Sequence, residues 1–219
     1  MADVITDVAR PDLVVSQLNA PDTAAHVEGP DAEAALACYR ETDALLGVLR
    51  DHLDWDDTVW IIVSDHDQEA LDDRGPIDLR PEFARRELNL FAIPEGSATV
   101  ICGEGARDVE PWLRDVDGVQ GVRPFRVKDT ALECCLAWSA PGRAFGFAEM
   151  GTERGTHGGP RTRAQVAVVT GGHRAVEPLM RAATAQPISA TDWAPTIAAL
   201  LGVHLPTTGG RALVPVTER

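Results

Sequence analysis

The first 64 residues place apolar stretches on either side of a long amphipathic one. Residues 12–18 (DLVVSQL) predict a short buried strand. Residues 31–53 carry a stripe of large side chains at helical spacing, which predicts a helix: Leu36, Tyr39, Leu46, Leu49 and Leu53. Residues 58–64 (TVWIIVS) are apolar without alternation, as expected of a strand covered on both faces. Strand, crossover helix and strand form a βαβ unit, which predicts an α/β fold with a mostly parallel sheet and helices on both faces.

A different texture begins near residue 76, with a charged, proline-marked connection. Short apolar runs and one amphipathic stretch then alternate up to residue 150, which is typical of an α+β lobe. A buried strand (QVAVVT) returns at 165–170, and a last helix at about 191–201 ends before Gly202. We therefore expect a core made of residues 1–87 and 151–219 and a small inserted lobe at 88–150. The strands expected within the lobe are LNLFAI, ATVICG, GVRPFRV, ALECCLAW and AFGFAEM, with a helix in GARDVEPWLRDV.

Length and charge limit the partners. The chain has 219 residues, of which 44% are hydrophobic, enough for one medium domain or one domain with a small appendage. Its 20 basic and 34 acidic residues give a formal net charge of −14. This argues against a nucleic-acid polymer or an anionic membrane as the main partner. An anionic small molecule remains possible, because divalent cations can reverse the sign of the potential inside a site.

Cysteine usage and the N-terminal residues favour a reduced, cytoplasmic protein. The cysteines, Cys38, Cys102, Cys134 and Cys135, match neither a zinc knuckle nor a CxxC motif. The stretch MADVITDVAR has no cationic region followed by an apolar one, so no signal peptide is expected. No apolar run approaches the roughly 18 residues of a membrane span.

Three short motifs contain metal-binding side chains. Asp22 and His26 in DTAAH are four residues apart, which places both on one face of a helix, either as metal ligands or as an ordinary solvated pair. Asp65 and His66 directly follow the predicted strand at 58–64. Ligands of open parallel sheets bind at the carboxyl ends of the strands, so the two residues are either metal ligands or part of an ordinary turn that ends the strand. His157 lies in GTHGGP, whose glycines permit close approach to a ligand or merely form a turn.

Together these motifs resemble the alkaline phosphatase superfamily, and most closely its type I phosphodiesterase/nucleotide pyrophosphatase branch. The resemblance rests on D-x-x-x-H followed by Gly-Pro and a long helix, then a strand and Ser-Asp-His, then G-x-H-G-G. The ending TDWAPTIAALLGVHLPTTGGRAL is also similar to the last helix of that family and the segment after it. One departure is Asp67, where the family commonly has glycine after Ser-Asp-His.

The resemblance implies a two-metal site, most simply with zinc, although manganese or iron would also suit Asp and His ligands. Asp22, His26 and His157 match the ligands of one ion, and Asp65 and His66 match ligands of the other. The family's nucleophile is a Thr or Ser that precedes these motifs, together with a further Asp ligand. We find no match to either, so the chain resembles the C-terminal portion of such an enzyme, and we assign no catalytic residue.

Two functions are consistent with this pattern. The first is a metal-dependent phosphoester hydrolase that acts on a small molecule and needs an N-terminal half, a second chain or a second copy. The second is a non-catalytic metal-binding or interaction module, a degenerate or truncated relative. The sequence does not select the leaving group.

Overall fold

The computed structural model describes residues 11–147, 153–206 and 209–215. The chain divides into two compact units. The first contains residues 1–17, 43–65 and 165–219, and the second contains residues 18–42 and 66–164. Each is described by itself.

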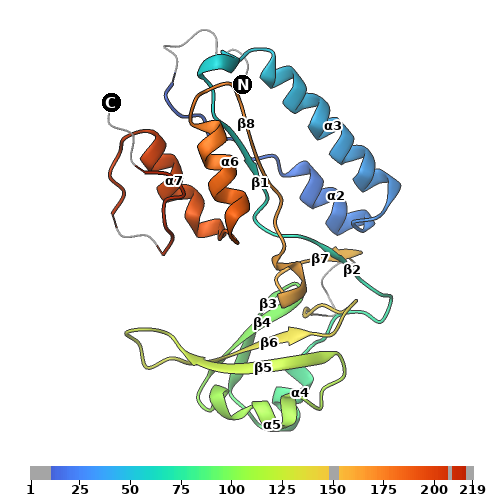
Figure 1. Cartoon of the computed structure of the whole chain (residues 1–219). Helices are drawn as coiled ribbons and strands as arrows, with labels where there is room; N and C mark the ends of the chain where they lie inside the picture. Colours follow the sequence, from blue (N-terminus) through green and yellow to red (C-terminus); the bar gives the residue numbers. More distant parts are fainter. Residues whose placement is uncertain (1–10, 148–152, 207–208, 216–219) are drawn as a thin grey trace. The chain divides into compact units, whose positions relative to one another are not determined.

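The first unit is built around a two-stranded antiparallel ribbon, β1 (Trp60–Val63) and β8 (Ala167–Thr170). Helices α6 (Val176–Ala185) and α7 (Trp193–Leu200) pack beside it (Figure 1). Their contact is a small apolar core in which Leu179, Ala199 and Val214 are buried. Ile61 and Val169 of the ribbon pack against this core, so one face of the ribbon is covered by these helices. The 3₁₀ turns Trp55–Asp57 and Ala190–Asp192 precede β1 and α7.

The last two turns of the long helix α3 (Glu33–Arg50) also belong to this unit. Leu46 and Gly47 of α3 line an open groove of about 400 Å³ together with Trp60 and Ile62 of β1. The alternate residues of β1 therefore face α3 on one side and the α6/α7 core on the other. This explains why the strand has an apolar sequence without alternation.

The predicted parallel sheet is wrong. Apart from an isolated parallel bridge between Ile77 and Phe145, every strand pairing in the described residues is antiparallel. β1 pairs with β8, which runs in the opposite direction, and residues 12–18 form no strand. A strand with a continuously apolar sequence is expected to be covered on both faces, but the sequence does not indicate whether the neighbouring strand is parallel or antiparallel. The predicted helix at 31–53 is confirmed as α3.

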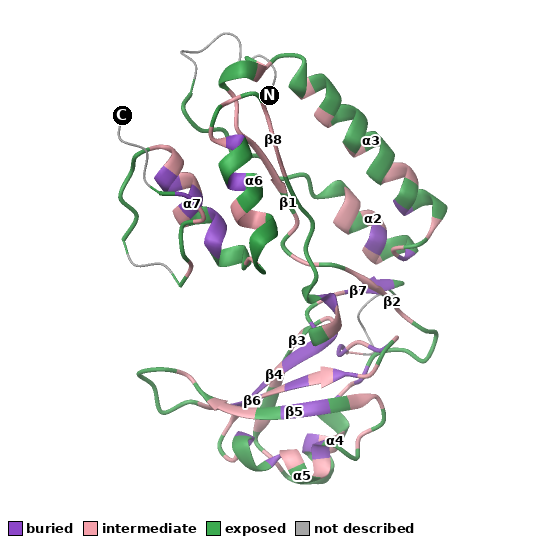
Figure 2. Cartoon of the chain, in the orientation of Figure 1, coloured by how far each residue is buried: buried purple, intermediate pink, exposed green. Residues whose placement is uncertain are grey.

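The second unit contains a four-stranded antiparallel sheet in the order β3-β4-β6-β5 (Figure 1). Its strands are β3 (Leu90–Glu95), β4 (Ala98–Gly103), β5 (Val119–Arg126) and β6 (Glu133–Ser139). One face of the sheet carries the main core, in which Ile101, Leu113 and Phe83 are buried. The short helices α4 (Arg80–Arg85) and α5 (Glu110–Leu113), with the 3₁₀ turn Ala106–Asp108, supply the rest of that core. Figure 2 shows the buried positions concentrated along the middle strands.

A disulfide joins Cys102 to Cys134, contrary to the reduced cysteines expected from the sequence. The two residues are register partners on the neighbouring strands β4 and β6, with Cα atoms 4.4 Å apart. Cys38 and Cys135 are free thiols. Burial raises the pKa of the Cys135 thiol to about 11, so it is a poor nucleophile at neutral pH.

The second unit also contains α2 (Ala20–Glu28), the ribbon of β2 (Glu69–Ala70) and β7 (Gly155–Thr156), and the 3₁₀ turn η3 (Pro160–Arg163). Four of the five strands expected at 88–150 form the four-stranded sheet. The fifth lies partly in residues 148–150, outside the described residues. The division into a core and an inserted lobe stays a prediction. Among the described helices, none is long and apolar enough to cross a membrane.

Candidate metal centre

Helix α2 carries the first two predicted ligands. It starts with a proline in its first turn, a position where the missing N–H costs nothing. Asp22 and His26 lie one turn apart, and Asp22 Oδ1 is 3.6 Å from His26 Nε2. The structure therefore places both side chains on one face of a helix, as the spacing predicted.

The ribbon of β2 and β7 brings the other two histidines together. Glu69 pairs with Thr156 and Ala70 with Gly155, so the residues flanking this pairing are held side by side. His66 precedes β2 and His157 follows β7. Their rings stack with centroids 3.7 Å apart and an angle of 17° between the planes.

Asp22, His66 and His157 form one group, in which one ligand atom from each lies within 4.8 Å of the other two. Donor atoms around a tetrahedral zinc ion stand about 3.4 Å apart, given bonds of about 2.0–2.1 Å. Modest side-chain rotations would therefore bring all three donors onto one ion. One carboxylate and two imidazoles suit zinc, manganese or iron.

His26 lies beside this group. Its ring centroid is 5.0 Å from that of His157, and its Nδ1 lies 3.0 Å from the carbonyl oxygen of Gly155. A carbonyl only accepts hydrogen bonds, so Nδ1 is the donor to Gly155, and Nε2, on the side of Asp22, is the ring nitrogen that faces the group. Histidine ligands of metals are commonly oriented by such a bond from the other ring nitrogen.

Glu153 is a nearby carboxylate that the sequence did not single out. Its Oε2 is 3.4 Å from His26 Nδ1, and its side chain is half exposed. It lies five residues before Gly158 in the same glycine-rich segment, yet no spacing rule marks it as a partner of α2.

Asp65 and His66 are consecutive, but they fall in different compact units. Asp65 is exposed, and its backbone oxygen accepts a hydrogen bond from the side-chain amide of Gln165 in the same unit. The role of Asp65 as a ligand stays a prediction.

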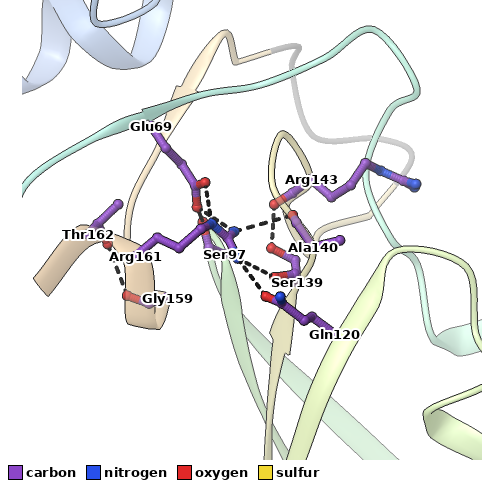
Figure 3. Close-up of polar contacts among 9 residues, drawn as sticks. All are labelled: Glu69, Ser97, Gln120, Ser139, Ala140, Arg143, Gly159, Arg161 and Thr162. Carbon is purple, nitrogen blue, oxygen red and sulfur yellow. Dashed lines mark hydrogen bonds and ion pairs between the residues drawn. The ribbon is translucent and has the colours of Figure 1, made fainter.

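A polar network supports the loop that carries His157 (Figure 3). Arg161 of η3 binds Glu69 of β2 through two hydrogen bonds of 2.7 Å, Nε to Oε2 and Nη2 to Oε1. Ser97 donates a further bond of 2.6 Å to Glu69 Oε1. The remaining Arg161 donors bind the carbonyl oxygens of Ser139 and Ala140 and the side chain of Gln120. Each nitrogen of the Arg161 guanidinium is thus engaged within the second unit.

The turn between β3 and β4 packs directly against the loop that carries His157. The backbone N–H of Ser97 donates to the carbonyl oxygen of His157 at 2.6 Å. Gly158 has φ of +93°, and a Cβ there would collide with the carbonyl oxygen of Glu95. The glycine after His157 is therefore required both by its backbone conformation and by the close approach of this turn.

Acidic groups dominate the electrostatics around α2. Burial raises the pKa of the Tyr39 phenol, and the nearby charges of Asp22 and Asp67 raise it further. Tyr39 therefore stays protonated at neutral pH. A site this rich in negative charge favours a bound cation.

Comparison with known proteins identifies the family. A family model described as "Type I phosphodiesterase / nucleotide pyrophosphatase" matches residues 1–110, half of the chain. The chain belongs to this family. The resemblance drawn from the motifs is thereby confirmed. No curated protein sequence matches the chain.

Two solved structures share the fold of this family member over part of their length. One is phosphonoacetate hydrolase from Sinorhizobium meliloti in complex with phosphonoacetate, at 14% identity and a TM-score of 0.53. The matched region covers 68% of this chain and 43% of the hydrolase chain. The other is murine ectonucleotide pyrophosphatase/phosphodiesterase 5, an inactive form in complex with AMP, at 17% identity and a TM-score of 0.54. Here the matched region covers 69% of this chain and 45% of the murine protein's chain. This chain therefore spans less than half the length of either solved structure.

Proposed function

We propose that the chain provides the metal-binding part of a phosphoester hydrolase that acts on nucleotide-like phosphodiesters or pyrophosphates. The single observation that carries the proposal is the Asp22/His66/His157 group in a member of the phosphodiesterase family. The acidity of the chain fits this role, because metal ions are what would make such a site attractive to an anionic substrate.

Asp22, His66 and His157 would hold one ion, with His26 beside them as a further ligand. This differs from the set implied by the resemblance, which assigned His66 to the second ion together with Asp65. Asp65 would remain part of a second site. Zinc is the first choice, with manganese or iron as alternatives. In this chemistry a pair of divalent ions activates the attacking oxygen and stabilises charge on the phosphoryl oxygens. The chain's own residues supply the ligands and orient them. The carbonyl oxygen of Gly155 orients the His26 ring through a hydrogen bond, and hydrogen bonds of Ser97 and Arg161 position the loop that carries His157.

Metal content tests the site directly. The purified chain is expected to bind zinc, and Asp22→Ala and His157→Ala are each expected to lose at least tenfold in affinity, measured by competition with a chromophoric chelator. His52→Ala is the matched control, because His52 is exposed in the other unit and its Nδ1 lies 2.8 Å from the carbonyl oxygen of Val48. Equal affinity in all four proteins would overturn the assignment of the ligands.

Activity requires a separate experiment. We expect hydrolysis of an aryl phosphodiester only when the N-terminal portion of a homologous domain is supplied, as a second chain or by fusion. The substrate class is suggested by the homologue bound to AMP. Turnover that is equal with and without the added portion, and unaffected by His157→Ala, would refute it.

A second function is favoured by one observation. The described group contains three ligands from a single unit, which account for one ion, whereas two-metal hydrolysis needs ligands for two. The alternative is therefore a non-catalytic module that binds one metal. It predicts one ion per chain and no turnover even with the N-terminal portion present.

A cytoplasmic location is part of the proposal and is measurable through the disulfide. Glutathione keeps most cytosolic thiols reduced, so a Cys102–Cys134 bond found intact in protein trapped from cells would point to an oxidising compartment instead.

A further inference from the structure

Gln68 connects all three segments that carry the metal ligands of the second unit. It lies two residues after His66 and immediately before β2. Its side-chain Nε2 donates to Asp22 twice, to the carboxylate Oδ1 at 2.6 Å and to the backbone oxygen at 3.2 Å. The residue is only partly exposed, so these bonds to α2 are shielded from competition with water.

The other end of the Gln68 amide faces β7. A Cβ added at Gly155 would lie 3.0 Å from Gln68 Oε1 and would collide with the carbonyl oxygen of Ala25. Gln68 Oε1 is buried and has no hydrogen-bond partner among the described residues. The side chain therefore fills the space between α2 and the strand that leads to His157.

The orientation of this amide follows from its surroundings. Turning it over would place the amide oxygen against the carboxylate and the carbonyl of Asp22, two groups that only accept hydrogen bonds. The unpartnered Oε1 is the cost of keeping Nε2 on Asp22. A buried polar atom left without a partner destabilises the fold, so the residue is poorly explained by stability alone.

We propose that Gln68 is a positioning residue of the metal centre, which holds the Asp22 carboxylate in place beside His66 and His157. The inference rests on the proposed function, because it assigns a role toward the metal. Residues that hydrogen-bond to metal ligands typically change metal affinity by 10–100-fold when they are replaced. Fixing the carboxylate before the ion arrives removes part of the ordering cost of binding.

Gln68→Met tests this directly, because methionine keeps the length of the side chain and removes both polar atoms. We expect zinc affinity to fall 10–100-fold in chelator competition, while the melting temperature in EDTA changes by only a few degrees. The matched control is Gln186→Met, at an exposed position after α6, which is expected to leave zinc affinity unchanged. Unchanged affinity in Gln68→Met, with wild-type protein binding zinc, would overturn the inference and leave the proposed function standing.

A metal-free measurement keeps the inference testable if Gln68→Met does not fold. In EDTA, the side-chain amide resonances of Gln68 are expected to move in Asp22→Ala toward the positions found for exposed Gln186, while those of Gln120 stay in place. If they do not move, the bond to Asp22 is absent in solution and the inference fails. Failure of the wild-type chain to bind zinc overturns the proposed function and, with it, the role of Gln68 toward the metal.

Discussion

Replacement of Arg161 by methionine is expected to destabilise the second unit strongly. Arg161 donates two hydrogen bonds to the Glu69 carboxylate, two to backbone carbonyls and one to Gln120. The side chains of Arg161 and Glu69 are only 26% and 16% exposed. Methionine would leave Glu69 largely out of water, and among the described residues the Ser97 hydroxyl would be its one remaining side-chain hydrogen-bond donor.

The magnitude follows from this environment. Removing one partner of a buried ion pair costs about 3–5 kcal/mol, and the partial exposure of this pair reduces that to about 2–4 kcal/mol. For a chain of this size, 1 kcal/mol lowers the melting temperature by about 2–4 °C, so a loss of about 3 kcal/mol corresponds to roughly 6–12 °C. Zinc affinity is expected to fall as well, because Arg161 holds the loop of His157.

Urea unfolding in EDTA, followed by circular dichroism, measures the loss. The matched control is Arg114→Met, which breaks an exposed i,i+4 pair with Glu110 and is expected to cost no more than about 0.5 kcal/mol. The double variant Glu69→Leu with Arg161→Met is expected to recover much of the stability, because it removes both charges. A loss below about 1 kcal/mol in Arg161→Met, or no recovery in the double variant, would refute the view that this pair is buried and coupled.

Three further predictions concern separate features. Gly158→Ala is expected to lower both the melting temperature and zinc affinity, because φ is +93° and the added methyl meets backbone; an unchanged melting temperature would contradict it. The carboxylate of Asp192 accepts two backbone hydrogen bonds that lower its pKa, so its stabilisation is present above the unfolded pKa of about 3.9 and disappears as the pH falls through the lower folded value. Asp192→Ala should therefore be less stable than wild type at pH 7, by about 1–3 kcal/mol, with a gap that narrows below about pH 4 in urea titrations; a gap independent of pH would contradict this. Finally, Cys102→Ala with Cys134→Ala is expected to cost about 3–4 kcal/mol, from the loop of 32 residues that the disulfide closes, and alkylation of unreduced, denatured protein should label two of the four cysteines; labelling of all four would exclude the bond.

Much of the local structure could be predicted from periodicity. The helical stripe after residue 31 corresponds to α3, and the apolar run at 58–64 corresponds to β1. The direction of pairing could not be predicted, because an apolar strand between two helical layers has the same sequence whichever way its neighbour runs. The strand predicted at residues 12–18 does not form, and the reason is different. An apolar run becomes a strand only with a partner, and Leu13 and Val15 are 47% and 81% exposed.

The candidate site was predictable where its signal is local. The i,i+4 spacing of Asp22 and His26 depends on helix geometry alone, and it placed both side chains on one face. Gln68 and the pair of Glu69 and Arg161 gave no such signal, because their partners lie 46 and 92 residues away along the chain. Contacts at that range depend on tertiary packing, which periodicity does not describe.

The glycine-rich loop around His157 shows how the two kinds of information combine. Sequence alone left the loop as either a turn or a ligand site, since glycine is common in both. In the structure, a side chain at Gly155 would collide with α2, and one at Gly158 would collide with the turn before β4. Glycine is therefore required at both positions, because a different element packs against the backbone at each. The two positions lie on either side of His157, which forms a group with Asp22 and His66. A simple surface turn would not require packing on both sides, so the glycines favour a loop built to hold His157 in one position.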